Sequence, residues 1–350
     1  MKQNTAQTTA ATAFVIDDDW RTWLAHNLSQ NVHPTALEAV LRERGASAEA
    51  ARQEIDRVLA SPYFLGAAQT VRRDAERIKK YNWLLDIFRK NNDQRDDGRV
   101  VPRRHQLSRE VFFADYYFQN RPVIITGMVD HWPALKKWNL DYLRSHFGQC
   151  AVEVQTGRTR DRDYEINTLA HKQTMPLASF VDMIAAAGSS NDFYMTANNG
   201  SVNRAALAGL WDDIGDLPAY MDRSSASDGF LWIGPKGTLT PFHHDLTNNV
   251  MVQLAGRKRV TLVPAYDYPN MYNHQHCYSQ VDGGAPDFER FPLLRKANVI
   301  ECELAPGDIL FLPVGWWHYV ESLDVSITVS MINFLAKNDH YSNYETYHAL

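Results

Sequence analysis

The segment TPFHHDLTNN places a histidine and a carboxylate two positions apart, at His243 and Asp245. On a strand, side chains two positions apart leave the same face, so these two can reach one metal ion while His244 faces the opposite way. His318, in GWWHYVESL, offers a third ligand from a strand far along the chain. Two histidines and one carboxylate leave the opposite coordination face open for an oxo-acid and dioxygen, which is typical of non-haem iron(II) sites.

The HxD spacing alone is a weak signal, because it arises by chance in many chains. Two polar residues on apolar strand faces strengthen it. In RKRVTLVP, Lys258 shares a face with Val260 and Leu262, where a lysine is costly unless an anion pairs with it. In SITVSMINF, Asn333 shares a face with three apolar residues. We interpret these residues as the lining of a site for a dicarboxylate cosubstrate. The alternative is that Lys258 extends out of the barrel end and Asn333 bonds only to backbone.

The remaining candidates for metal chemistry do not form a second site. Cys150, Cys277 and Cys302 are odd in number and widely scattered, which is typical of reduced thiols in a cytosolic protein rather than of a disulfide or zinc framework. His274 and His276, in NHQHC, have metal-like spacing but no carboxylate partner of their own. Pro, Asn and Gly flank their segment, so we predict a loop near the mouth of the site.

Composition and charge argue against several classes of partner. The chain has 350 residues, a formal net charge of -5 and a pI near 6.2. A surface built to neutralise phosphates or anionic lipids is not expected from these values, so we expect no nucleic-acid partner. No apolar run approaches the roughly 18 residues of a membrane helix, and the first residues lack a signal-peptide pattern. We therefore predict a cytoplasmic protein that does not bind membranes.

The pattern along the chain changes from helical to β-rich. Before the change, HPTALEAVLRERG has a proline where a helix can begin and a glycine where it can end. After it, short runs such as PVIITGM, VMVQLAG and DILFLP alternate with Gly, Pro and Asn, which indicates an antiparallel sandwich or barrel. A role of the helical part in recruiting a partner or in dimerising stays open. We predict five parts: a disordered tail (1–14), a helical region (15–90), a linker (91–104), the main catalytic domain (105–337) and a C-terminal tail (338–350).

From about Arg109 to Lys337 the chain resembles the JmjC, cupin-like 2-oxoglutarate oxygenases. The strings that carry the resemblance are RPVIITGMVDHWPALKKWNLDYL, IGPKGTLTPFHHDLTNN, GRKRVTLVP, SQVDGGAPDFERFP, APGDILFLPVGWWHYVESL and SITVSMINF. Within the family they are most similar to the asparaginyl hydroxylase that inhibits the hypoxia-inducible transcription factor. The resemblance implies a mainly β fold, a double-stranded β-helix barrel of the jelly-roll or cupin type, with flanking helices beside the N-terminal helical region.

The resemblance also implies the residues of the site. Iron(II) would be held by His243, Asp245 and His318, with 2-oxoglutarate as the cosubstrate and dioxygen as the oxidant. Lys258 would grip the distal carboxylate of 2-oxoglutarate. The other residues that the resemblance implies for this pocket are Thr240, Tyr194, Asn249 and Asn333.

The implied reaction is hydroxylation of a side chain in a peptide or protein. N-demethylation, small-molecule biosynthetic oxidation and a non-catalytic binding module are the alternatives that the sequence leaves open, and a homodimer is left open as well. One departure concerns the substrate, because Cys277 and Tyr278 stand where the asparaginyl hydroxylase carries an Arg-Gln pair that engages its substrate. Arg158, Asn198 and Asn199 are further candidate substrate contacts.

Overall fold

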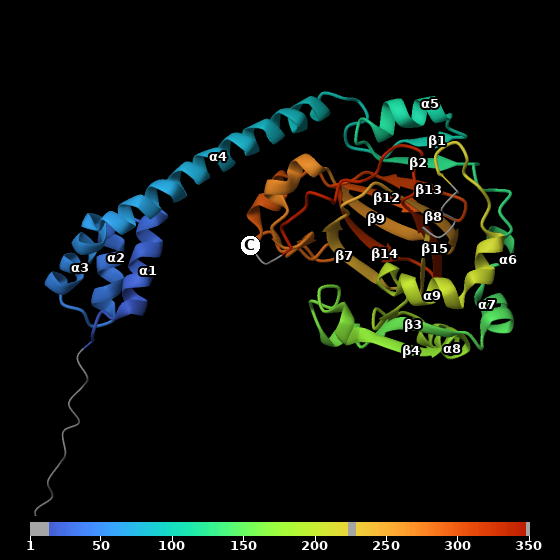
Figure 1. Ribbon diagram of the computed structural model, residues 1–350, viewed down its shortest axis with the longest axis horizontal. Helices are drawn as coiled ribbons and strands as arrows, with labels where there is room; N and C mark the ends of the chain where they lie inside the picture. The colour runs from blue at the N-terminus through green and yellow to red at the C-terminus, as the bar shows by residue number, and fades with distance from the viewer. Residues whose placement is uncertain (1–13, 223–228, 348–350) are drawn as a thin grey trace, which may run out of the picture. The chain divides into compact units, whose positions relative to one another are not determined.

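The computed structural model describes residues 14–222 and 229–347 (Figure 1). The predicted disordered tail, residues 1–14, lies outside the described residues except for Phe14. The chain divides after Leu85 into two compact units. Within the described residues, no helix combines the length and the apolar composition that crossing a lipid bilayer requires.

The first unit is helical, as predicted. The side chains of Asp17 and Ser47 cap two of its helices by accepting hydrogen bonds from backbone N–H groups of the first turn, and Pro34 begins a third. Buried leucines of the first two helices meet apolar residues of the third in its core. The last helix continues to Asp93, so the first residues of the predicted linker, 91–104, are helical. The helices are α1 (Asp18–Ser29), α2 (Pro34–Glu43), α3 (Ala48–Ala60) and α4 (Pro62–Asp93), whose first part belongs to this unit.

The second unit is built on two six-stranded sheets. Four strands of one sheet have the order β6-β15-β8-β13, and four of the other have the order β7-β14-β9-β12. These eight strands are antiparallel to their neighbours and have the order of a jelly roll. The predicted fold class is therefore confirmed. The eight strands are β6 (Gly229–Gly234), β7 (Leu239–His244), β8 (Asn249–Ala255), β9 (Lys258–Val263), β12 (Ile300–Leu304), β13 (Ile309–Leu312), β14 (Trp317–Ser322) and β15 (Ser326–Met331).

Shorter strands and helices surround this framework (Figure 1). Two strands extend the first sheet beyond β13, β2 (Val123–Thr126) and β1 (Arg103–His105), and two extend the second beyond β7, β11 (Tyr278–Ser279) and β10 (Asn273–Gln275). A third sheet has the order β4-β3-β5, formed by β3 (Ala151–Thr156), β4 (Lys172–Pro176) and β5 (Phe193–Tyr194). The helices are α5 (Arg109–Val111), which runs into a π-helical turn at Phe112–Tyr117, α6 (Ala134–Lys137), α7 (Leu140–Phe147), α8 (Leu177–Ala187) and α9 (Gly200–Ala206).

Three strands of the first sheet, β2, β8 and β13, contribute to two different cores. Apolar side chains of both sheets meet between them, among them Ile124 and Leu310 of the first sheet and Val260 of the second. Alternate residues of the first sheet, such as Val329, face outward instead and join a larger core with helix residues such as Phe180 of α8. The alternation along each strand therefore decides which side chains reach the space between the sheets.

Candidate metal centre and adjoining cavities

His243, Asp245 and His318 meet at one point. His243 lies near the end of β7, Asp245 follows that strand, and His318 lies on β14 opposite His243 in the strand register. Their ligand atoms all lie within 4.8 Å of one another, and His243 Nε2 is 3.7 Å from Asp245 Oδ1. In the part of the chain that the structure describes, this is the one cluster of three such residues that could hold a metal ion.

Hydrogen bonds orient the two histidine rings for a metal. His243 Nδ1 lies 2.9 Å from the Pro241 carbonyl oxygen and His318 Nδ1 lies 3.0 Å from the Trp316 carbonyl oxygen. Each Nδ1–H therefore donates to backbone, and each Nε2 keeps its lone pair for an ion. Burial lowers the pKa of His243 to about 4 and also lowers the pKa of His318. Both rings are therefore neutral near pH 7, which is the form that binds metals.

Asn249 holds the third ligand in place. Its Nδ2 donates to Asp245 Oδ2 over 3.3 Å, and the other carboxylate oxygen, Oδ1, is the one that lies beside His243. Asn249→Ala is expected to weaken Mn(II) binding by about 10- to 100-fold, the usual effect of removing a partner that orients a metal ligand. Calorimetric titration of the apoprotein measures this, with the exposed Asn91→Ala as a control. An unchanged affinity for Mn(II) in Asn249→Ala would contradict the role.

A β-bulge brings Thr240 to the same cavity. On β14, His318 and Val320 are two apart and face His243 and Thr240, which are three apart on β7. The extra residue on β7 reverses the alternation, so both Thr240 and His243 line the metal cavity. His244 lies on the other side of the strand, as the spacing predicts, with its ring 4.8 Å from that of Trp317. The pattern of residue types does not reveal this bulge.

A cavity of about 300 Å³ contains the metal ligands and Lys258. Only 1% of Lys258 is exposed. Its Nζ donates to the Tyr194 hydroxyl over 3.0 Å and lies 5.9 Å from the centre of the Trp232 ring. Among the described residues, no carboxylate forms an ion pair with this lysine. A buried ammonium group without a counter-charge is costly, so the cavity favours an anionic ligand.

The structure does not bring Asn333 into this cavity. β15 ends at Met331, and the Asn333 amide donates to the Asp222 carbonyl oxygen instead. The reason is the alternation of β15, because the residues that share a face with Asn333, such as Val329, belong to the outward core. Ser330 and Ile332, on the other face, line the cavity. Of the four residues expected beside Lys258, the structure thus brings Thr240, Tyr194 and Asn249 to the cavity wall or to the lysine itself.

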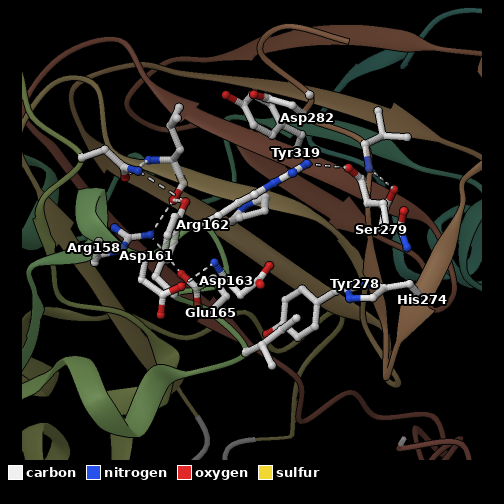
Figure 2. Close-up of a pocket in the computed structure, with 18 of the residues that line it drawn as sticks. Arg158, Asp161, Arg162, Asp163, Glu165, His274, Tyr278, Ser279, Asp282 and Tyr319 are labelled. Carbon is white, nitrogen blue, oxygen red and sulfur yellow. Dashed lines mark hydrogen bonds and ion pairs between the residues drawn. The ribbon is translucent and has the colours of Figure 1, made fainter. Parts of the chain in front are cut away.

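A second cavity of about 510 Å³ adjoins the first (Figure 2). Glu165 and Tyr278 line both cavities. Figure 2 shows Arg158, Asp161 and Glu165 on one side of it, and Tyr278 on the other side. The Tyr278 ring also stacks on the His243 ring at 5.8 Å. The second cavity therefore leads to the metal centre past these two side chains.

Glu165 is a site residue that the sequence did not single out. It is 8% exposed, and its carboxylate accepts hydrogen bonds from Arg158 Nη2 at 3.0 Å and from Asn198 Nδ2 at 3.1 Å. Two of the three predicted substrate contacts thus meet at this carboxylate. The third, Asn199, instead closes a helical turn by accepting a hydrogen bond from the Thr196 backbone N–H. Glu165 lies in RTRDRDYEIN, where five neighbours are also charged, so no pattern distinguishes it.

His274, His276 and Cys277 lie at or beside the two cavities, and each makes different contacts there. His274 lines the second cavity, while His276 stacks on Tyr347 at 5.2 Å. Cys277 lines the metal cavity, where burial raises the pKa of its thiol to about 12. None of the three cysteines is in a disulfide. The departure at Cys277 and Tyr278 therefore lies within the cavities, where it can affect which substrate fits.

Asp161 organises the segment that carries Glu165. Its carboxylate lies 3.0 Å from His171 Nε2 and accepts hydrogen bonds from Asn167 Nδ2 at 2.9 Å and from the Asp163 backbone N–H at 2.8 Å. These hydrogen bonds, that of His171 first, lower the pKa of Asp161 to about 2. The same contact raises the pKa of His171 above its ordinary value.

The pair makes the contribution of this contact to stability depend on pH. A raised pKa in the folded state contributes stability that is complete below the ordinary value of about 6.5 and is lost as the pH rises through the folded value. Asp161→Asn is therefore expected to lower the pKa of His171 toward about 6.5. An NMR titration of the His171 ring measures this, with the exposed His146 as an internal reference. If Asp161→Asn leaves the His171 titration where it is, the pairing is wrong.

Two facing sheets in jelly-roll order, with two histidines and one carboxylate beside a buried lysine, define a protein of the cupin class with a candidate metal site. A family model of the cupin-like domain matches residues 108–340, more than half of the chain. The chain therefore belongs to this family, that of the JmjC-type 2-oxoglutarate oxygenases.

Known proteins with related sequences carry several names. Lysine-specific demethylase 8 of Xenopus tropicalis is 32% identical over 249 residues, which cover 67% of this chain and 53% of that protein. Lysine-specific demethylase JMJ30 of Arabidopsis thaliana is 33% identical over 243 residues, covering 66% and 54%. tRNA wybutosine-synthesizing protein 5 of Gallus gallus is 28% identical over 269 residues, covering 73% and 84%. The chain thus spans about half the length of the two demethylases. The narrower resemblance to the asparaginyl hydroxylase stays an expectation.

Proposed function

We propose that this protein is an iron(II)- and 2-oxoglutarate-dependent dioxygenase that hydroxylates a side chain of a peptide or protein. The observation that carries the proposal is the content of one small cavity, in which two histidines, one aspartate and a buried lysine face the same space, and within the described residues that lysine has no carboxylate partner. The donor set suits a divalent ion with open positions. The lysine suits an acid that binds that ion at one end and carries a second carboxylate at the other.

Each residue has a separate task in this proposal. His243, Asp245 and His318 would hold the iron, and Asn249 would keep the Asp245 carboxylate turned toward it. Lys258 would bind the distal carboxylate of 2-oxoglutarate by a charge-assisted hydrogen bond. The bound iron and cosubstrate would supply the oxidation, in which dioxygen and 2-oxoglutarate yield succinate, carbon dioxide and one oxygen atom for the substrate.

The rest of the cavity wall limits access of water. Its apolar lining is formed by Phe230, Trp232, Met251, Val320 and Ile332. This lining offers few partners for water, because the one N–H group among these side chains, Trp232 Nε1, already donates to Ser330. The larger second cavity continues from the metal centre past Glu165 and Tyr278. Room of this size next to the metal supports an extended substrate such as a polypeptide over a small metabolite.

N-demethylation is the second candidate. The names of two groups of relatives support it, because they are called lysine-specific demethylases. Their chemistry would use the same iron and cosubstrate site, so the geometry is equally suited to it. The net charge and pI predict that the protein does not act on nucleic acid. The relatives do not support this prediction, because one of them is named as a tRNA wybutosine-synthesizing protein. A tRNA substrate therefore belongs in the test.

Succinate release separates these candidates. Protein loaded with Fe(II) is incubated with 2-oxoglutarate, dioxygen and one of three substrate sets: peptides, methylated peptides or tRNA. We expect succinate to form fastest with unmethylated peptides, with a mass gain of one oxygen atom in the peptide. Formaldehyde release from methylated peptides would assign demethylation instead. Metal-loaded protein that never converts 2-oxoglutarate, with any substrate, would overturn the proposal.

A further inference from the structure

Arg158 is a buried cation that the proposed reaction does not use. It follows β3 and begins a short helical turn, Arg158–Arg160. Its side chain has no exposed surface, which is rare for arginine. Arg158 stands at the wall of the second cavity, but with no exposed surface it is poorly placed for the direct substrate contact that the sequence suggests. Its contacts indicate a different role.

The guanidinium group joins three parts of the wall around the two cavities. Its Nη2 donates to Glu165 Oε1 at 3.0 Å and to the Leu239 carbonyl oxygen at 2.7 Å. Its central carbon lies 4.2 Å from the Tyr164 ring centre and 5.2 Å from the Tyr194 ring centre. The buried Nε and Nη1 have no acceptor atom among the described residues, and the faces of these rings take that place.

Two of these contacts, those with Tyr194 and Leu239, connect Arg158 to the end of the metal cavity where Lys258 lies. Tyr194 lies on the two-residue strand β5, and its hydroxyl is the acceptor for Lys258 Nζ. Leu239 begins β7 and precedes Thr240, which lines the metal cavity. A strand as short as β5 cannot by itself fix a tyrosine ring, so the ring depends on what packs against its face.

We propose that Arg158 is a positioning residue for the cosubstrate: its guanidinium group holds the Tyr194 ring so that the hydroxyl meets Lys258. The inference rests on the proposed function, because it concerns the lysine that would bind the distal carboxylate. A lysine at position 158 keeps the charge but lacks the planar group that stacks on two rings while bonding to Glu165 and Leu239. Both Arg158→Lys and Arg158→Gln therefore disturb the position of Tyr194.

The test compares two 2-oxo acids that differ only at the end facing Lys258. Full-length protein loaded with Mn(II) is titrated by calorimetry with 2-oxoglutarate and with 2-oxobutyrate, which lacks the distal carboxylate. In Arg158→Lys and Arg158→Gln, the Kd of 2-oxoglutarate is expected to rise roughly tenfold or more. This is the usual effect of removing a residue that orients a ligand-binding side chain. The Kd of 2-oxobutyrate stays within about twofold, because its metal-binding end is untouched. Arg160→Gln, an exposed arginine on the same turn, leaves both values unchanged.

The ratio of the two Kd values separates positioning from general damage. Loss of folding or of the metal site would weaken the binding of both acids together. An equal rise of the two Kd values in both variants would therefore overturn the positioning role. So would an unchanged Kd of 2-oxoglutarate. Wild-type protein that binds neither acid would instead overturn the proposed function itself. Tyr194→Phe, which removes only the hydroxyl, is expected to raise the same ratio, and Arg158→Gln should add little to its effect because both act through one contact.

Discussion

Asp245→Ala is expected to reduce conversion of 2-oxoglutarate to below roughly one-thousandth of the wild-type rate, because it removes one of three ligands that act as a unit. Asp245 is the single negative charge of the cluster, and its Oδ1 lies 3.7 Å from His243 Nε2. The two remaining imidazoles are neutral and offer a divalent ion only two donor atoms. Mn(II) affinity measured by calorimetry should fall together with activity.

The control for this change is an aspartate with a surface partner. Asp182 is exposed and lies 3.3 Å from Arg144 on the surface, and an exposed ion pair of this kind contributes little to stability. Asp182→Ala should therefore leave both metal binding and turnover as they are. Full activity in Asp245→Ala, with the unfolding temperature unchanged, would contradict the assignment of the metal centre.

Lys258→Ala is expected to weaken 2-oxoglutarate binding by about 30-fold to several thousandfold, which corresponds to about 2–5 kcal/mol for losing one partner of a buried charged pair. The cavity would keep its metal ligands, so Mn(II) affinity should not change. This divergence distinguishes a cosubstrate contact from a structural one, because unfolding would lower both affinities. The measurement is the same pair of titrations, with Mn(II) first and 2-oxoglutarate second.

Lys136 on α6 provides the matched control. It is exposed and lies outside both cavities, so Lys136→Ala should bind 2-oxoglutarate with wild-type affinity. If Lys258→Ala also bound it with wild-type affinity, the ammonium group would have another partner. The proposed cosubstrate site would then be wrong even if the metal centre were right.

The sequence predicted those parts of the site that depend on spacing within one strand. His243 and Asp245 are two apart and converge, and His244 faces away from the cavity to pack on Trp317. Lys258 shares the inward face of Val260, as its position on RKRVTLVP implies. In each case alternation along an extended chain was sufficient. The jelly roll followed from short β-rich runs and from the family resemblance together.

The sequence failed where a contact depends on which face of a strand turns inward or on loops far apart. Asn333 has the right residue type but lies in line with the outward face of β15. Both faces of that strand are buried, so the pattern of apolar residues does not reveal which face points into the cavity. Thr240 reaches the cavity only because β7 contains a bulge. Glu165 becomes notable only when folding buries Arg158 beside it. Burial and register arise from tertiary structure, so a single sequence does not supply them.

A crystal structure of the protein with Mn(II) and 2-oxoglutarate tests the account most directly. It should show one ion bonded to His243 Nε2, Asp245 and His318 Nε2, chelated by the oxo-acid end of 2-oxoglutarate. The distal carboxylate should lie within hydrogen-bond distance of Lys258 Nζ. An ion bound elsewhere, or a cosubstrate whose distal carboxylate points away from Lys258, would contradict the account.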